Sequence, residues 1–544
     1  MKRIIIISLS SIAIISSILK LYTVDFSIPA HFDDLRFILD SIQYGDGDFF
    51  LAQKKHPGWP LFLTPFVSLI ESNNFLDFSN IVRSVSLSIS TISIIPMYLL
   101  SKKFFNEKFS LAATSLFAFE PHLNYNSGQG LSEPLLILVF IITFLFILNN
   151  RSKFHYLAFI FAGFCWWIRI EVIAPIFAVI IISFFIHRKT PNFSKNLLIC
   201  FILLIIVIAP LFVQRQLQFD DPFYVWYSQT IFSDSYAELL TNPDDSGFEN
   251  FISNYGAVGL IDRLANGFIN LFVQLYAISF PYLIILLPFG ILFSLRPIDH
   301  EPQNIKANWI ILLTFIAVLI IPFAIINERR FLFPLYPFLI ILSTIPIYRV
   351  TNFGLNTFGF KEKQKSQFLI IVICIVLFLS IIFTSGILGV GYGSPNYILE
   401  QEKIKFTQHL IDNYSGRMLK DVETTDYLTV LLLTSDTENH FKNFKSPRGT
   451  DPYPERYNPG DVVELSVHGK NIEELITNGK AKNLKFIGIT EYGSYYFPYL
   501  DELYKNDKKY NFLTKIMDSK QMGYQKLKMK IFEIDYTKFK SILD

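Results

Sequence analysis

The sequence has little charge and little cysteine. Charged residues make up 17% of its 544 residues, against about 25% in an average soluble protein. They gather in short stretches between long runs that are almost free of charge. The net charge of +2 provides no basic excess of the kind that nucleic-acid binding requires, so we expect no nucleic-acid partner. The three cysteines, Cys165, Cys200 and Cys374, lie in apolar runs without a CxxC pattern, which gives little support to a disulfide framework or a zinc site.

Long apolar runs fill most of the first 390 residues. A bilayer core about 30 Å thick needs about 20 apolar residues per helix, so these runs predict a polytopic α-helical membrane protein. The first run, residues 4–19, is long for a signal peptide and is not followed by a clear cleavage site, so we interpret it as a retained helix. About eleven transmembrane helices are predicted, near residues 3–22, 78–101, 109–123, 132–149, 155–170, 171–187, 196–216, 267–295, 308–327, 331–349 and 367–389.

Basic residues occur in alternate loops. If Lys2 and Arg3 are cytoplasmic, the alternation of eleven helices places the basic loops on the cytoplasmic side, as the positive-inside rule requires. A loop on the other side, residues 120–131, has no Lys or Arg. We therefore expect a multi-pass plasma-membrane protein with a cytoplasmic N-terminus and an extracellular C-terminal domain. The basic loops contain Lys102, Lys103 and Lys108, then Arg151 and Lys153, then Arg188, Lys189 and Lys195, and finally Arg349, Lys361, Lys363 and Lys365.

The composition changes near residue 391, where Lys, Asp and Glu become frequent. We expect two domains: residues 1–390 in the membrane, including an external loop at 23–77, and residues 391–544 as a soluble extracytoplasmic α/β domain. The stretches "KNLKFIGIT" and "KLKMKIFEIDY" predict strands because β-branched and aromatic residues are frequent in them. "NIEELITNGK" and "YLDELYKNDKKYNFLTKIM" are predicted as helices.

The external loop is unusually acidic. "DDLRFILDSIQYG" has helical spacing and predicts a short amphipathic helix on the membrane surface, with Asp33 and Asp34 at its positive end. "HPGWPLFLTPFVSLI" predicts a rigid turn and a second short apolar helix. The acids taken alone are equally compatible with an ordinary solvated loop.

This order of elements resembles the GT-C class of membrane glycosyltransferases, in particular the protein O-mannosyltransferase and aminoarabinose transferase group, glycosyltransferase family 39 and its relatives. That group carries "DE", an aromatic residue and then "HPPL" or "KPPL" in the first external loop. The counterparts are Asp33-Asp34, Phe37 and the "HPGWP" of residues 56–60. Asp34 replaces the second acid, and Gly58 replaces the second proline.

The resemblance extends over most of the membrane part through the order and spacing of further residues. The external C-terminal region matches nothing in that group that we can name. The matching positions are Arg83 in the second predicted helix, Glu133 after the third, Arg169 in "WWIRIEVIAP" and Arg330 in "NERRFLFPLYPF".

The resemblance implies transfer of a sugar, mannose or another hexose, from a polyprenyl- or dolichyl-phosphate carrier to an acceptor hydroxyl outside the cytoplasm. Such a reaction needs a base for the acceptor and cations for the departing phosphate. It implies Asp33 as the base, with Asp34 orienting base or acceptor and Glu133 sharing the acceptor site. Alternatives remain open: Asp33 as a helix cap, Arg169 as a partner of Glu171, and His56 as a support for the turn. The predicted phosphate-binding residues are Arg330, Arg329, Arg169 and His56.

The predicted partners are a polyprenyl-phosphate-linked sugar donor, a protein, glycan or lipid acceptor, and membrane lipids. The sequence requires no cofactor, although a pair formed by Asp33 and Glu133 is suited to Mg²⁺ or Mn²⁺.

Three other functions are compatible with parts of the sequence. An oligosaccharyltransferase would share the architecture, but its "WWDYG"-type motif is missing from the region after residue 391. A transporter would require internal repeats and charges at mid-membrane, and we find neither. A receptor or scaffold would depend on residues 391–544 instead of Asp33.

Overall fold

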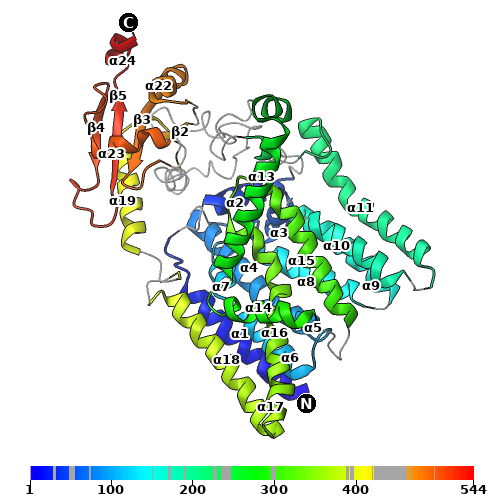
Figure 1. Cartoon of the computed structure of the whole chain (residues 1–544). Coiled ribbons are helices and arrows are strands. Elements are labelled where there is room, and N and C mark those ends of the chain that lie inside the picture. The colour runs from blue at the N-terminus through cyan, green and yellow to red at the C-terminus, as the bar shows by residue number, and fades with distance from the viewer. Residues whose placement is uncertain are drawn as a thin grey trace.

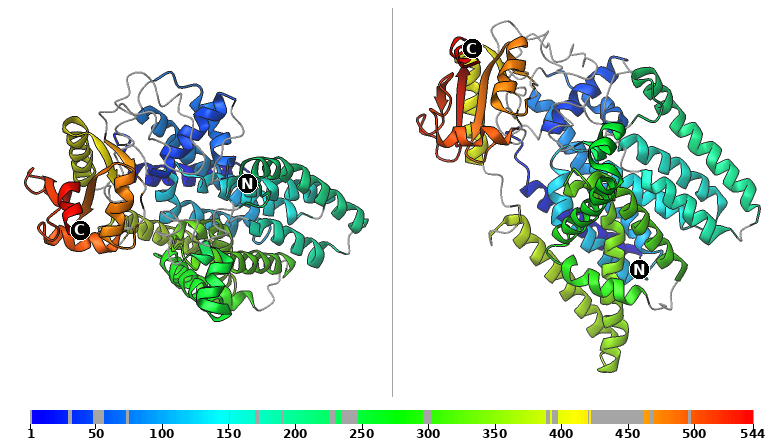
Figure 2. Two further views of the ribbon diagram at one scale, coloured as in Figure 1. Left: turned by 90° about the horizontal axis from the view of Figure 1, so that it is seen from above. Right: turned by 45° about the horizontal axis from the view of Figure 1, so that its top comes forward.

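The chain folds into a large helical bundle and a smaller α/β domain (Figure 1). The N-terminus lies at one end of the bundle, and the C-terminal domain lies beside the opposite end (Figure 2). The computed structural model describes residues 2–28, 32–47, 56–72, 75–149, 151–169, 173–188, 191–224, 230–233, 247–295, 302–387, 391–392, 397–419, 421, 462–465, 467, 469–494 and 497–543.

The bundle consists of apolar helices, of which the longest pass between its two ends. Its main helices are α1 (Lys2–Tyr22), α4 (Phe75–Ile92), α5 (Ile94–Ser101), α6 (Glu107–Ala118), α8 (Glu133–Ile147), α9 (Ser152–Ile168), α10 (Ala174–Ile182), α11 (Phe193–Phe219), α13 (Phe248–Ile278), α14 (Leu283–Ser294), α15 (Pro302–Phe323), α16 (Tyr336–Arg349) and α18 (Glu362–Ser385). Shorter elements complete it: α2 (Phe32–Gly45), α3 (Gly58–Val67), α7 (Pro121–Ser127), η2 (Ser183–His187), η4 (Thr230–Phe232), η6 (Arg329–Leu335), η7 (Val350–Gly354) and α17 (Leu355–Thr357).

Seven helices within the described residues are long and apolar enough to cross a membrane. They confirm a polytopic helical membrane protein. The predicted count of eleven is not confirmed, because several predicted spans form helices shorter than the roughly 20 residues that a bilayer requires. These shorter apolar helices include Glu133–Ile147, Ala174–His187 and Leu283–Ser294. The sidedness of the two termini also stays a prediction.

Helix α16 occupies the centre of the bundle. Every residue from Tyr336 to Tyr348 is buried, as expected for a helix that is apolar on all sides. Phe338 packs against Phe140 and Phe144 of α8, with ring centroids 5.3 Å and 5.2 Å apart. Such edge-on aromatic contacts add to the energy of burial alone. The start of α8 and the segment before α16 are therefore held near each other.

The acidic loop does form the two predicted helices, α2 and α3. Residues 37–41 in the middle of α2 are all buried within the protein, and the position of the helix at the membrane surface stays a prediction. Ser41 Oγ donates to the Pro60 carbonyl of α3 at 3.1 Å, and α2 packs against both α3 and α4. Tertiary contacts thus cover the polar side of this helix as well as its apolar side.

The C-terminal domain contains a five-stranded mixed sheet in the order β2-β1-β3-β5-β4. β1 is parallel to β2 and β3, whereas β5 is antiparallel to β3 and β4. The strands are β1 (Gly416–Leu419), β2 (Val462–Leu465), β3 (Leu484–Thr490), β4 (Leu513–Asp518) and β5 (Met529–Ile534). The helices are α19 (Tyr397–Asn413), α22 (Ile472–Ala481), α23 (Asp501–Lys505) and α24 (Tyr536–Leu543), with the 3-10 turn η9 (Pro498–Leu500).

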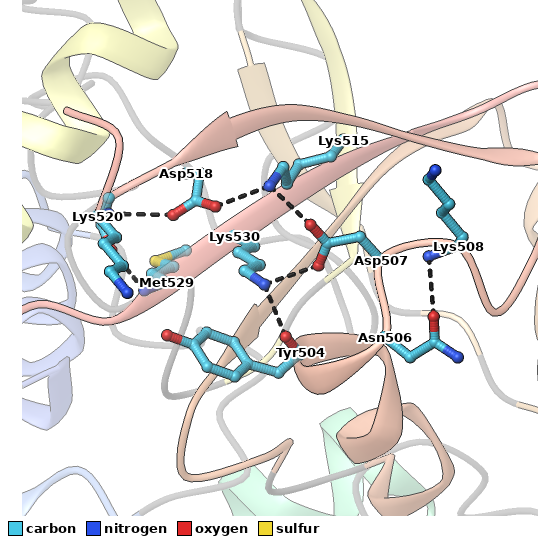
Figure 3. A network of polar contacts seen from close by, with 10 residues as sticks. Tyr504, Asn506, Asp507, Lys508, Lys515, Asp518, Lys520, Met529 and Lys530 are labelled. Atoms are coloured by element: carbon cyan, nitrogen blue, oxygen red, sulfur yellow. Dashed lines mark hydrogen bonds and ion pairs between the residues drawn. The ribbon is translucent and has the colours of Figure 1, made fainter.

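Most predictions for this domain are confirmed, because β3, β5 and α22 occur where expected. The single helix predicted for residues 499–517 is wrong. Only Asp501–Lys505 is α-helical there, and Leu513–Asp518 forms β4 on the outer side of β5. Asp507 lies between the two elements and accepts from Lys515 and Lys530 (Figure 3). The gain from pairing with β5 therefore overrides the local helical pattern.

The segment that leads to the C-terminal domain is anchored on the bundle at α7. The Tyr392 hydroxyl lies 2.5 Å from Nδ1 of His122, and the Tyr392 ring stacks on Tyr125 with centroids 3.9 Å apart. The predicted domain boundary at residue 390 remains a prediction, although this contact lies immediately beside it.

Candidate functional site

A buried carboxylate and two arginines meet at one end of the bundle. Glu133 begins α8, Arg169 caps the end of α9, and Arg330 lies in the first turn of η6. Arg169 forms an ion pair with Glu133 Oε1, and Arg330 Nη1 lies 3.9 Å from the same oxygen. Glu133 has no exposed side-chain surface, whereas Arg169 and Arg330 are 14% and 26% exposed. Three segments far apart in the sequence therefore share one charge cluster.

Two further charges border this cluster. Arg330 also pairs with Glu328 at 2.6 Å, and the neighbouring Arg329 donates from Nε to Gln274 Oε1 at 3.0 Å. The ion pairs described here join Arg169 and Arg330 to Glu133 and Glu328, and Arg329 precedes Arg330 in the same turn. Arginine forms paired hydrogen bonds with phosphate oxygens, so Arg329 and Arg330 are candidates to bind a phosphate.

The local backbone explains why these side chains converge. Glu133 lies in the first turn of α8, where the helix dipole stabilises a carboxylate, and Pro134 beside it is tolerated because the first N–H groups of a helix have no partner within it. Arg169 leaves α9 in an extended conformation, and its guanidinium carbon lies 5.2 Å from the centroid of the Phe331 ring. The side chain is thus held between α8 and η6.

The "HPGW" turn joins the ends of α8 and α9. The His56 ring contacts the Trp166 carbonyl of α9, and Trp59 Nε1 donates to the Gly130 carbonyl, just before α8, at 3.0 Å. A Cβ atom on Gly58 would lie 2.6 Å from the backbone of Trp167. Gly58 stands where the family that this chain resembles has its second proline. At this position α9 lies too close to leave room for a side chain.

His56 is buried and is held in one tautomer. Burial lowers the pKa of His56 to about 3, and the positive charge of Arg215 also lowers it. The hydrogen bond to Trp166 has the opposite effect and raises the pKa. The ring is therefore neutral near pH 7, with Nδ1–H donating to the carbonyl. The turn-supporting alternative for His56 thus has a structural basis, and its contact with phosphate stays a prediction.

Arg215, near the end of α11, is a buried charge that the sequence analysis did not single out. Its guanidinium carbon lies 5.9 Å from the centroid of the Tyr224 ring. The available signal was a lone arginine within the apolar run "FILLIIVIAPLFVQRQLQF", since a charge inside a membrane segment indicates a specific environment. Glu328 was likewise missed, because its place between two apolar runs makes it look like an ordinary loop acid in the sequence.

Other predicted residues are placed only in part. Asp33 and Asp34 lie in the first turn of α2, but their side chains lie outside the described residues, as does Glu171. Arg83 is structural: it donates to the carbonyls of Gly128 and Ile28 at 2.9 Å and 2.8 Å. Because the side chain of Asp33 is outside the described residues, its predicted metal-binding pair with Glu133 stays a prediction. The carboxylate of Glu133 is itself paired with Arg169.

The arrangement of the whole chain matches known membrane enzymes. An apo oligosaccharyltransferase of Archaeoglobus fulgidus superimposes with a TM-score of 0.57 at 10% identity, covering 89% of this chain and 69% of that chain. The ArnT protein of Cupriavidus metallidurans, solved with undecaprenyl phosphate, matches with a TM-score of 0.50 at 9% identity and covers 97% of both chains. This chain has the GT-C fold. The oligosaccharyltransferase AglB of A. fulgidus with an inhibitory peptide and a dolichol-phosphate matches with a TM-score of 0.53 at 11% identity, covering 91% of this chain and 72% of that one.

These likenesses confirm the fold that the sequence resemblance implies. No protein-family model matches the sequence, and the curated proteins contain no significant match. The GT-C fold of this chain is therefore evident from the arrangement of its helices and not from sequence similarity.

Proposed function

We propose that this protein is a glycosyltransferase that moves one sugar from a polyprenyl-phosphate carrier to an acceptor hydroxyl at the end of the bundle that contains Glu133. The observation that supports this most directly is the convergence of Arg169 and Arg330 on the buried Glu133, with Arg329 next to Arg330 in the same turn. Two of the matching GT-C structures hold undecaprenyl phosphate and dolichol-phosphate, which are lipid phosphates of the class that such a cluster would bind.

In this proposal the acidic start of α2 supplies the base. Asp33 takes the proton of the acceptor hydroxyl as the acceptor oxygen attacks the anomeric carbon of the sugar, and Asp34 orients the acceptor. The bond between that carbon and the phosphate oxygen breaks, and the negative charge passes to the lipid phosphate. Arg330 and Arg329 stabilise the departing phosphate, and Arg169 adds to their field.

Glu133 has two functions in the proposal. Its Oε1 atom fixes Arg169 and lies 3.9 Å from Arg330, so it positions the cations. Its second oxygen, Oε2, is buried and has no hydrogen-bond partner among the described residues, and an acceptor hydroxyl would satisfy it. We keep mannose or another hexose as the expected sugar and a protein, glycan or lipid as the acceptor.

An oligosaccharyltransferase-like activity is the second candidate. It is favoured by the TM-score of 0.57 with the Archaeoglobus enzyme, while the ArnT match covers both chains almost from end to end. The two candidates differ in what is transferred, because an oligosaccharyltransferase moves a preassembled glycan. The mass added to the acceptor distinguishes them.

The test is a transfer assay with the full chain in membranes and radiolabelled polyprenyl-phosphate hexoses. Intact protein should label an acceptor, whereas Asp33→Asn should reduce the rate by about 10²-fold or more, since a positioned base contributes about 10²–10⁴-fold. Asp77→Asn, which changes an exposed acid at the start of α4, is the matched control and should retain full activity. Equal transfer by intact protein and Asp33→Asn would remove Asp33 from the mechanism. Failure with every lipid-linked donor would contradict the proposed function itself.

A further inference from the structure

A hollow lies at the opposite end of the bundle from the charge cluster. Its volume is about 410 Å³, and it opens between the end of α5, the end of α8 and the start of α9. Glu133 begins α8, and the hollow contacts the other end of that helix. At a rise of about 1.5 Å per residue, the twelve residues from Glu133 to Leu145 separate the two sites by roughly 18 Å. The hollow lies outside the proposed catalytic region.

The lining has two chemically distinct parts. One part is apolar, and Leu99 in it is 44% exposed on the surface of the bundle, where lipid tails would contact it. The other part is polar and carries two positive charges. The lining residues are Leu99, Leu145, Phe146 and Phe154 on the apolar side, and Lys102, Lys103 and Asn149 on the polar side.

The walls of the hollow are held by tertiary contacts. His155 Nε2 donates to the Asn149 carbonyl at 2.6 Å, and His187 Nε2 donates to the Ile147 carbonyl at 2.8 Å. These bonds satisfy carbonyls at the end of α8 that no helical N–H reaches. Phe146 also stacks on Phe154 with ring centroids 5.6 Å apart. The hollow is therefore formed before any ligand enters.

The charged residues that line the hollow, Lys102 and Lys103, are both basic. Lys102 lies 3.8 Å from Glu107, but both groups are partly exposed, so this pair is weak. Lys103 adds a second charge, and Arg151 and Lys153 follow Asn149 in the sequence. A basic rim above an apolar wall matches an amphiphile that has an anionic head and a hydrocarbon tail.

We propose that this hollow binds an anionic phospholipid of the surrounding membrane. Its phosphate contacts Lys102 and Lys103, and one of its chains lies along Leu99 and Phe146. The proposal is independent of the transferase activity, because it uses none of the residues assigned to donor or acceptor binding.

The experiment measures lipid binding to the purified full chain in nanodiscs and by native mass spectrometry. Phosphatidylglycerol is the probe, phosphatidylcholine is the neutral comparison, and a polyprenyl phosphate is the third arm. The intact chain should retain phosphatidylglycerol in preference to phosphatidylcholine. The double variant Lys102→Gln/Lys103→Gln should bind it about tenfold more weakly or worse, because each basic residue at a lipid surface contributes roughly a factor of five.

Two further variants keep the result interpretable. Lys195→Gln/Lys363→Gln removes two exposed lysines outside the hollow and should bind phosphatidylglycerol like the intact chain. Leu99→Trp fills the apolar side from the lipid-facing surface and should reduce binding without loss of charge, even if the double lysine variant is poorly folded. Unchanged binding by both hollow variants, or equal retention of the two phospholipids, overturns the proposal. Binding of the polyprenyl phosphate alone also overturns it, since the occupant would then be the sugar carrier.

Discussion

Two charge networks in this chain use the same kinds of side chains in different surroundings. In the C-terminal domain, Asp507 lies 2.6 Å from Lys515 and 2.7 Å from Lys530, and its side chain is 29% exposed (Figure 3). In the bundle, Glu133 has no exposed surface and lies between Arg169 and Arg330. Water reaches one network and is excluded from the carboxylate of the other.

This difference in solvent access separates a dispensable network from an indispensable one. An exposed charge that loses its partner is still solvated by water, so the pair contributes little to stability. A buried charge that loses its partner pays the full cost of desolvation. The Glu133 network is therefore expected to determine both the shape of the site and a sizeable part of the stability of this end of the bundle.

The largest effect is expected from breaking the buried network on one side. Arg169→Met leaves the Glu133 carboxylate with Arg330 at 3.9 Å and should destabilise the protein by about 3–5 kcal/mol, as removal of one partner of a buried pair does. Thermal unfolding in detergent, followed by tryptophan fluorescence, measures the change. Adding Glu133→Gln to the same chain should recover part of the loss. A double variant as unstable as the sum of the two single variants would show that the pair is not coupled.

A smaller effect is expected where the "HPGW" turn meets α9. Gly58→Ala would place a Cβ atom 2.6 Å from the Trp167 backbone and should cost about 1–3 kcal/mol, the usual penalty for overpacking. Gly354→Ala is the matched control, because its Cβ would meet only Val350 at 3.9 Å. If the two variants melt at the same temperature, α9 does not restrict the turn.

The neutral, buried state of His56 makes stability depend on pH. Its pKa falls from 6.5 to about 3 on folding, so below pH 6.5 the unfolded chain binds a proton that the folded chain does not. Stability should therefore decrease as the pH falls from 6.5 towards 3, by at most about 1.4 kcal/mol per pH unit. His56→Gln does not titrate, and its melting temperature should change less than that of the intact chain between pH 7.5 and pH 5.5. Identical pH profiles for the two proteins would contradict the assignment.

The smallest effect is expected in the C-terminal network. Asp507→Asn should cost only about 0.2–1 kcal/mol, measured by hydrogen exchange of peptides from β4 and β5 in the full chain. Although burial opposes it, hydrogen bonding to Lys515 and Lys530 lowers the pKa of Asp507 below 3.8. The small contribution of Asp507 is therefore present at neutral pH and is lost only as the pH falls below that value. A loss comparable to that of Arg169→Met would remove the distinction between the two networks.

The sequence predicted the class of fold because membrane insertion depends mainly on local composition. Long apolar runs such as residues 196–216, in which Arg215 is the one charged residue, identify helices without knowledge of their neighbours. The order of Asp33, His56, Glu133 and Arg330 along the chain carried the GT-C resemblance. The strand at residues 484–490 was predictable for the same reason, because the β-branched and aromatic residues that indicate it lie within the segment itself. Where a local pattern competed with a tertiary partner, as in residues 513–518 beside β5, the sequence alone gave the wrong element.

The sequence named Glu133, Arg169 and Arg330 as candidates for one site, but it did not predict the contacts between them. Sequence spacing left Arg169 free to pair with Glu171 or to bind phosphate, and only the packing of α8 against α9 placed it on Glu133. The same packing decided that Gly58 must lack a side chain and that His56 is neutral. Composition determines which segments leave water, since that depends on each segment alone. Which charges become partners depends on distances between segments, and those exist only in the folded chain.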